Sequence, residues 1–178
     1  MRFKMDIFLV EPTTTHEKQA MAYRQEFLQN GEKINGSSGF VKYENYNEWL
    51  KMIKSQKVLE TSAETTPTTT YFTVRKEDNQ IIGNVQIRHH LTEKLQKYGG
   101  HIGYAVRPTE RKKGYGTAQL KLAIEKAKLC GLTQIMLSCS KDNNTSAKVM
   151  LNNGAIYIGD GLDKRKNRVT ENYVIDIG

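Results

Sequence analysis

The stretch RPTERKKGYG, residues 107–116, lies between a run with the pattern of a β-strand and a run with the pattern of an α-helix. It predicts a strand, a turn and a helix that begins at the turn. The first backbone N–H groups of a helix have no partner within it, and the helix dipole favours an anion beside them. Gly114 and Gly116 have no Cβ, so a ligand can come close to the backbone. With three consecutive cations at 111–113, the turn suits a phosphate or a pyrophosphate.

The spacing of the glycines in this turn excludes two common phosphate-binding loops. A P-loop ends in Gly-Lys-Ser or Gly-Lys-Thr, which this turn lacks, and a dinucleotide fold has the spacing G-x-G-x-x-G. The pattern from Arg111 to Gly116 is instead Arg-x-x-Gly-x-Gly. Taken alone, these residues leave a second interpretation open, which is a basic turn that only caps a helix.

The composition is that of a globular protein, and we expect one domain, 1–178. A chain of 178 residues, 38% hydrophobic and 26% charged, can bury one core but not two ordinary ones. The N-terminal run MRFKMDIFLV is short and interrupted by Asp6, and no later run is long enough to cross a bilayer, so we expect neither a signal peptide nor a membrane partner. Cys130 and Cys139 are expected to be buried thiols, which favours a cytoplasmic location.

The net charge of +8 is compatible with two kinds of partner. A basic surface attracts nucleic-acid phosphates, and it also suits a cofactor that carries several phosphate charges. The runs of like charge are short, at 111–113 and 164–166, and acidic residues are interspersed almost everywhere else. An RNA-binding module is therefore a weak hypothesis, and we expect no nucleic-acid partner.

In the N-terminal part of the chain, the pattern predicts a strand at 6–11, a helix from a cap at 13–15 to about residue 30, and a short helix at 47–53. The Thr-rich stretch 61–70 is expected to be a mobile surface connection. Residues expected on the buried sides of the two helices are Ala20, Tyr23, Phe27, Leu28, Trp49, Leu50 and Ile53.

From residue 71 onwards the pattern is that of an open sheet, with strands at 71–75, 81–88, 101–106, 134–140, 156–158 and 169–177. Residues 89–100 are expected to be a linker. In the second of these strands, Ile81, Val85 and Ile87 should share one face. The helix after Gly116 should end at Gly131, and a helix capped by Asn143 or Asn144 should end at Gly154. Their expected inner residues are Leu120, Ala123, Ile124, Ala127, Cys130, Ala147, Met150 and Leu151.

The order of these motifs resembles the GNAT superfamily of N-acetyltransferases. Arg-x-x-Gly-x-Gly is similar to the acetyl-CoA signature of that superfamily, and the resemblance extends through GHIGY (100–104), Asn143-x-x-Ser146 and Gly154. The upstream stretches EKINGSSG (32–39), TYF (70–72) and IRH (87–89) look like one bacterial branch of predicted acetyltransferases. The resemblance implies an α/β (α+β) fold, a GNAT-type αβα sandwich whose mixed, mostly antiparallel sheet has central strands splayed at the cofactor site.

The resemblance also implies an acetyl-CoA site where two parallel central strands, 101–106 and 134–140, splay apart. The backbone of the first strand would pair with the pantetheine arm, and the turn amides would hold the pyrophosphate. Asn143 would contact the cofactor, cap its helix, or do both. The expected cofactor residues are Tyr104, Ala105, Val106, Arg111, Lys112, Lys113, Gly114, Tyr115, Gly116, Thr117, Asn143 and Ser146.

The implied reaction is a direct attack of a neutral amine on the thioester carbonyl, with no covalent enzyme intermediate and no metal. It needs positioning, an oxyanion donor and a route for the amine proton. Many members of the superfamily have a Tyr four residues before the helix-ending glycine, where it can protonate the CoA thiolate. This chain has Met150 there, so the usual general acid is absent.

Two residues are candidates for the base. His101 titrates near neutrality and begins the motif strand, while Glu32 lies in the upstream loop. Each can instead be structural or solvated. Arg88, His89 and Tyr71 are candidates for binding the acceptor, with Arg88 able to contact an acceptor carboxylate.

Two functional hypotheses remain. The first is an acetyl-CoA-dependent N-acetyltransferase acting on a primary amine of a small molecule or peptide. The second, motivated by Met150, is a non-catalytic acyl-CoA-binding or regulatory domain that retains the cofactor cleft. The acceptor is not readable from the sequence, and pairing into a homodimer is open.

Overall fold

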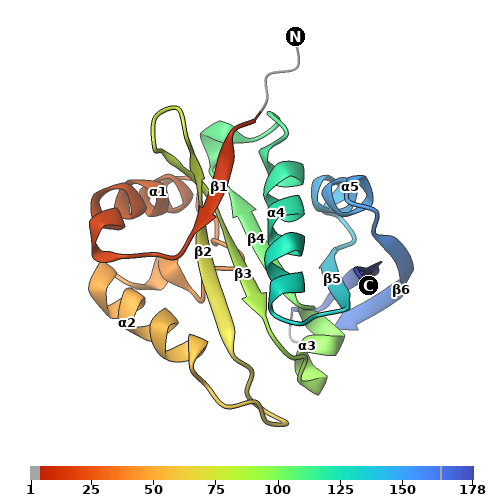
Figure 1. Ribbon diagram of the computed structural model, residues 1–178. Coiled ribbons are helices and arrows are strands. Elements are labelled where there is room, and N and C mark those ends of the chain that lie inside the picture. The colour runs from red at the N-terminus through yellow and green to blue at the C-terminus, as the bar shows by residue number, and fades with distance from the viewer. Residues whose placement is uncertain (1–4, 165) are drawn as a thin grey trace.

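The strands of the protein form two antiparallel sheets, which carry helices on their faces (Figure 1). The structure is a computed structural model and is described for residues 5–164 and 166–178. In chain order the elements are β1 (Ile7–Val10), η1 (Thr14–His16), α1 (Glu17–Gln29), η2 (Phe40–Lys42), α2 (Tyr46–Lys57), β2 (Thr68–Arg75), β3 (Ile81–Arg88), α3 (Glu93–Tyr98), β4 (Ile102–Val106), η3 (Pro108–Glu110), α4 (Tyr115–Leu129), β5 (Gln134–Ser140), α5 (Asn144–Asn152), β6 (Ile156–Asp163) and β7 (Arg168–Asp176).

The first sheet has the order β1-β2-β3-β4 and is covered on both faces. On one face lie α1 and α2, whose aromatic side chains build a core around Trp49, which stacks on Phe40 and Phe72. On the other face lies α4, which contributes Leu120 and Ala123 to a second core. Burial on both faces makes β2 and β3 almost continuously buried. The predicted α/β (α+β) sandwich with a mostly antiparallel, splayed sheet is confirmed.

A β-bulge changes the face of one strand, so the prediction that Ile81, Val85 and Ile87 share a face was wrong. Ile81 packs in the core with α1 and α2, whereas Val85 and Ile87 pack in the core with α4. Thr73 pairs with Gly83, but the next residue, Val74, pairs with Ile81, which inserts an extra residue into β3. Such an insertion reverses the alternation of side chains on either side of it.

Several predicted boundaries and burials also need correction. Residues 68–70 were expected in a surface connection. They are buried instead and form the first part of β2. The linker at 89–100 contains α3. Leu28 and Leu151, expected on inner helix faces, are 41% and 53% exposed, and Cys130, expected to be buried, is exposed at the end of α4.

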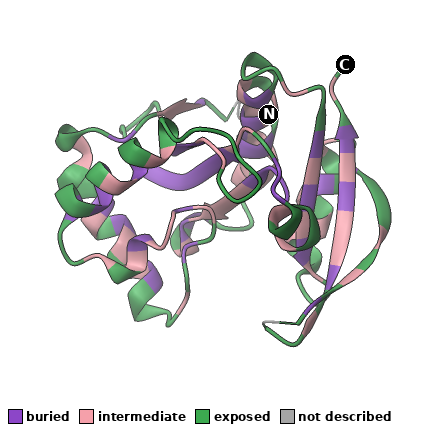
Figure 2. Ribbon diagram, turned by 90° about the horizontal axis from the view of Figure 1, so that it is seen from below, coloured by how far each residue is buried: buried purple, intermediate pink, exposed green. Residues whose placement is uncertain are grey.

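The second sheet has the order β5-β7-β6 and is almost separate from the first. One antiparallel bridge, between Gly100 and Leu137, links the two. Gly100 has φ +65°, and a Cβ there would lie 2.3 Å from the carbonyl oxygen of Met136, so the junction requires a glycine. In the described part of the chain, no parallel ladder joins β4 to β5. The strands therefore separate beyond the junction, and Figure 2 shows the two halves of the molecule on either side of it.

The edge strand of the second sheet is β6, which exposes Ile156, Ile158 and Leu162. The homodimer stays a prediction, and this edge is the surface on which two copies could pair. In the described ranges, no helix has the length and hydropathy needed to cross a membrane.

Candidate functional site

The candidate site lies where β4 leaves β5. At the junction, the His101 N–H donates to the Met136 carbonyl at 2.7 Å, and the Met136 N–H donates to His101 Nδ1 at 2.9 Å. Beyond it, β4 pairs with β3 alone, so its other edge has no strand partner among the described residues. A strand edge with open N–H and C=O groups can pair with an extended ligand. The expected pantetheine-binding residues Tyr104, Ala105 and Val106 lie on this strand, where the Val106 carbonyl already accepts a hydrogen bond from Arg111 Nε at 3.1 Å.

The turn before α4 has the geometry of an anion-binding helix start. Gly114 is the N-cap residue with φ +88°, and Lys112 also has a left-handed φ of +61°. The helix has no side-chain cap hydrogen bond, so no capping side chain occupies its first N–H groups. These amides can receive an anionic ligand, and a turn that only begins the helix stays the alternative interpretation.

Two of the three cations of the turn are already paired with carboxylates. Arg111 makes two hydrogen bonds to Glu32, at 3.0 and 2.5 Å, and packs over the ring of Phe27. Lys113 Nζ lies 3.0 Å from Oε2 of Glu110, which is 8% exposed. These partners reduce the positive charge that the sequence attributes to the turn, so the backbone amides become its main anion-binding groups.

A network of ion pairs behind the turn, centred on the buried Glu110, was not identified from the sequence. Arg75, the last residue of β2, donates to Glu110 at 3.0 Å, to the Tyr115 hydroxyl at 3.2 Å and to Asp78 at 2.7 Å. Glu110 therefore holds both Arg75 and Lys113, and the network ties the turn to the first sheet. The only sequence signal was the short spacing from Arg75 to Asp78 and from Glu110 to Lys113, which many surface pairs share.

Gly116 has a packing role at the contact between α4 and α5. A Cβ there would lie 3.1 Å from Val149 Cγ2 on α5. Close by, Asn153 Nδ2 donates to the Thr117 carbonyl at 3.1 Å. The predicted cap of α5 is confirmed, because the Asn143 side chain accepts from the Ser146 N–H at 3.1 Å. The expected contact of Asn143 and Ser146 with a cofactor stays a prediction.

Met150 is buried on α5, so no proton donor stands at that position. A hydroxyl pair lies one helical turn earlier. The Tyr104 hydroxyl is 2.9 Å from Ser146 Oγ, and this contact ties β4 to α5. Burial raises the pKa of Tyr104 to about 12, although the bond to Ser146 acts in the opposite direction. The phenol is thus protonated at neutral pH and can donate a proton.

The two candidate bases have environments that make them weak bases. Burial, together with the charges of Arg88 and His90, lowers the pKa of His101 to about 4. The hydrogen bonds from Arg111 hold the pKa of Glu32 below its ordinary value. His101 also bridges β4 and β5, which is a structural task.

Three polar side chains on β3 face away from α4, those of Asn84, Gln86 and Arg88. Their alternation in the sequence was a signal of this face that the sequence analysis missed. Asn84 Nδ2 donates to the carbonyls of residues 35 and 36, at 2.8 and 2.6 Å. Gln86 Nε2 donates to Ser38 Oγ. A Cβ on Gly36 would lie 2.3 Å from the Gly103 carbonyl, so the loop between α1 and α2 lies directly on β4. We call this side of the sheet the rear face and the α4 side the front face.

The three expected acceptor-binding residues are not brought together. Arg88 lies on the rear face, where Nη1 donates to the Gly100 carbonyl at 3.0 Å. His89 contacts Thr69 and lies 3.8 Å from the Cys130 thiol at the end of α4. Tyr71 packs in the front core near Lys126. Only Arg88 of the three therefore remains a candidate on the rear face.

No cluster of His, Cys, Asp and Glu among residues 5–164 and 166–178 could hold a metal ion.

Comparisons with known proteins agree with this geometry. Residues 8–156 match the family model of the acetyltransferase (GNAT) domain. A search of curated proteins gives no match. Among solved structures, the chain is similar to an acetyltransferase from Salmonella typhimurium that modifies the N-terminal serine of the 50S ribosomal subunit protein L7/L12, with 15% identity, coverage of 98% and 97% of the two chains and a TM-score of 0.69.

Two further solved structures have the same fold. The microcin C7 self-immunity acetyltransferase MccE, in complex with acetyl-CoA and AMP, has 19% identity, coverage of 97% and 93%, and a TM-score of 0.66. A spermidine N-acetyltransferase chimera from Vibrio cholerae and hSSAT has 12% identity, coverage of 97% and 96%, and a TM-score of 0.64. At these identities the likeness concerns the fold.

Proposed function

Because the chain belongs to the GNAT acetyltransferase family, we propose that it transfers the acetyl group of acetyl-CoA directly to a primary amine. The observation that carries the proposal is the opening between β4 and β5, which has an unpaired strand edge on one side and an uncapped helix start at its end. Together they offer an extended partner for pantetheine and N–H donors for a pyrophosphate.

The amine would attack the thioester carbonyl from the rear face, and the CoA thiolate would leave toward the front. The C–N bond forms as the C–S bond breaks, the amine loses one proton and the thiolate gains one. Since His101 and Glu32 are both poor bases, we propose that the acceptor reacts from its neutral form and that its proton passes to water. The rate of acetyl transfer at a given pH would then depend on the unprotonated fraction of the acceptor, which the pKa of the amine sets.

Tyr104 is proposed to protonate the thiolate in place of the residue that Met150 replaces. Its hydroxyl lies beside Ser146 at the opening and stays protonated at neutral pH. A positioned general acid typically contributes about a hundredfold or more to a rate. Tyr104→Phe should therefore lower kcat by about that factor while the KM for acetyl-CoA changes little. Tyr157→Phe, which also loses one phenol hydroxyl but on the exposed edge strand β6, serves as the matched control.

Amine-dependent release of the CoA thiol, with the acetylated product identified by mass spectrometry, tests the proposed function. The alternative is a non-catalytic acyl-CoA-binding domain, which the buried Met150 favours. That alternative predicts saturable acetyl-CoA binding and no amine-dependent thiol release over a broad panel of amines. Absence of both binding and release would exclude both functions.

A further inference from the structure

Arg88 is a partly buried cation that has no carboxylate partner. Arg75, Arg107 and Arg111 each pair with a carboxylate at 3.0 Å or less. Among the described residues, no Asp or Glu forms an ion pair with Arg88, and its guanidinium donates to the carbonyls of Gly99 and Gly100. A desolvated charge without a counter-ion is unfavourable, and burial lowers the pKa of Arg88.

The unpaired edge of this guanidinium remains available. Nη1 makes both carbonyl contacts, at 3.4 and 3.0 Å. Nη2 has a long contact of 3.5 Å to Gln86 Oε1. Nε has no hydrogen-bond partner among residues 5–164 and 166–178, yet it is not among the fully buried atoms that lack one. Nε and Nη2 form the fork with which an arginine binds a carboxylate through two parallel hydrogen bonds.

The place of Arg88 connects it with the proposed reaction. Nη2 lies 3.6 Å from the position of a Cβ on Gly103, and Nη1 lies 3.7 Å from that on Gly99, so the guanidinium lies over the start of β4. At this point β4 and β5 begin to separate. The residue beside Arg88 here is His101, whose side chain is neutral. An anion bound here would stand on the side of the opening from which the acceptor would arrive.

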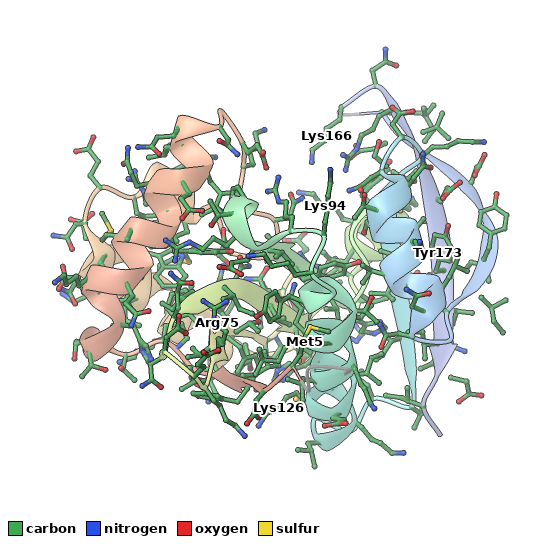
Figure 3. All side chains as sticks on the ribbon, turned by 90° about the horizontal axis from the view of Figure 1, so that it is seen from above. Met5, Arg75, Lys94, Lys126, Lys166 and Tyr173 are labelled. Atoms are coloured by element: carbon green, nitrogen blue, oxygen red, sulfur yellow. The ribbon has the colours of Figure 1, made fainter. Side chains whose placement is uncertain are left out.

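The surroundings hold Arg88 in place. Gln86 is fixed by Ser38, whose hydroxyl donates to Gln56 at 2.7 Å. Figure 3, seen from above, shows that Lys94 and Lys166 lie on the side of the molecule away from Lys126, which lies on α4. Arg88 is thus a fixed cation on a polar face, which disfavours a polyamine acceptor.

We propose that the acceptor is an amine that also carries a carboxylate, and that Nε and Nη2 of Arg88 bind this carboxylate and direct the amine toward the thioester. The inference rests on the proposed function and narrows its substrate class to amino acids or other amino-carboxylic acids.

The test compares matched acids and amides. Glycine, β-alanine and 4-aminobutyrate vary the distance between amine and carboxylate, and each is assayed beside its amide for release of the CoA thiol. The loss of a charged hydrogen-bonded pair reduces affinity about ten- to a hundredfold. The acid of at least one pair should exceed its amide in kcat/KM by that factor. Arg88→Gln should abolish the difference and Arg88→Lys should restore part of it.

Arg24→Gln is the control, since Arg24 likewise donates to two carbonyls, those of Phe40 and Val41. It should leave the preference for the acid intact. If Arg88 only supports the fold, Arg88→Gln will lower the melting temperature and reduce all acceptors equally. That result, or equal rates for acids and amides, would overturn the inference.

A binding experiment separates this inference from the proposed function. N-acetyl-β-alanine and its amide are titrated into the complex with CoA, so that no turnover is needed. Tighter binding of the acid, lost in Arg88→Gln, supports the carboxylate site even if no amine is acetylated and the proposed function fails. Equal binding of acid and amide excludes the site even if other amines are acetylated.

Discussion

The turn before α4, which we call the front turn, and the rear face of the sheet use the same residue types for different tasks. In the front turn, Arg111 and Lys113 pair with Glu32 and Glu110, so the cations fix the turn and leave anion binding to backbone amides. On the rear face, Arg88 has only carbonyl partners. A cation near a cleft therefore indicates a ligand site only when no carboxylate of the protein already neutralises it.

The junction that supports both faces should give the largest effect. Gly100→Ala places a Cβ 2.3 Å from the Met136 carbonyl oxygen at a φ of +65°. Strain and overpacking should reduce the free energy of unfolding by about 4 kcal/mol and weaken both acetyl-CoA and acceptor binding. Gly131→Ala, at φ +85° with no atom near its Cβ, should cost only about 1 kcal/mol. Equal losses of unfolding free energy for Gly100→Ala and Gly131→Ala in denaturant melts would contradict the close contact at the junction.

His101 makes the rear face sensitive to acid. Its pKa is about 4 in the fold, compared with an ordinary value of 6.5, so the unfolded chain takes up the proton first. The contribution of His101 to stability is therefore complete above about pH 6.5 and is lost as the pH falls toward 4, by up to about 3 kcal/mol. Denaturant melts from pH 4 to 8 should show a shallower acid loss in His101→Asn than in the parent chain. If the stability of the two chains falls in parallel toward low pH, His101 does not cause the acid sensitivity.

The network under the front turn should give an intermediate effect. Glu110→Gln leaves Arg75 and Lys113 without their shared buried charge and should reduce stability by about 2 kcal/mol. It should also raise the Kd for acetyl-CoA, whereas the preference between acid and amide acceptors stays the same. Asp78→Asn, at the exposed partner of Arg75, is the control and should change both quantities less. A changed acceptor preference would mean that the two faces are not independent.

The smallest effect is expected at Glu32, whose ion pair with Arg111 leaves 37% of the Glu32 side chain and 39% of the Arg111 side chain exposed. Such a pair contributes below about 1 kcal/mol. Glu32→Gln should keep kcat within about twofold, because a carboxylate with a lowered pKa is a poor base. The pH–rate profile of this variant should coincide with that of the parent chain. A large fall in kcat with a new pH dependence would identify Glu32 as the base after all.

Local patterns predicted the parts of the structure that depend on near neighbours. The helical spacing of Ala20, Tyr23 and Phe27 and the turn from Arg111 to Gly116 indicated α1 and α4 correctly. The Asn143 cap was equally local.

The missed features depend on partners that are distant in the sequence. Glu32 and Arg111 are separated by 79 positions, so no spacing rule relates them. The bulge that turns Ile81 to the other face depends on the register with β2. The polar alternation ending at Arg88 was visible, but its meaning required knowing that both faces of β3 are covered.

Calorimetric titration of acetyl-CoA is the most direct test of the account, because it asks which groups of the front turn bind the cofactor. The parent chain should bind one equivalent. Lys113→Gln should remain within about fivefold, since its charge is already paired. Gly114→Glu should lose about a hundredfold or more, while Gly114→Ala controls for the strain at φ +88° and for the contact of a Cβ with Met5 Cε at 2.7 Å. No binding by the parent chain, or equal binding by Gly114→Glu and Gly114→Ala, would contradict an anion site at the start of α4.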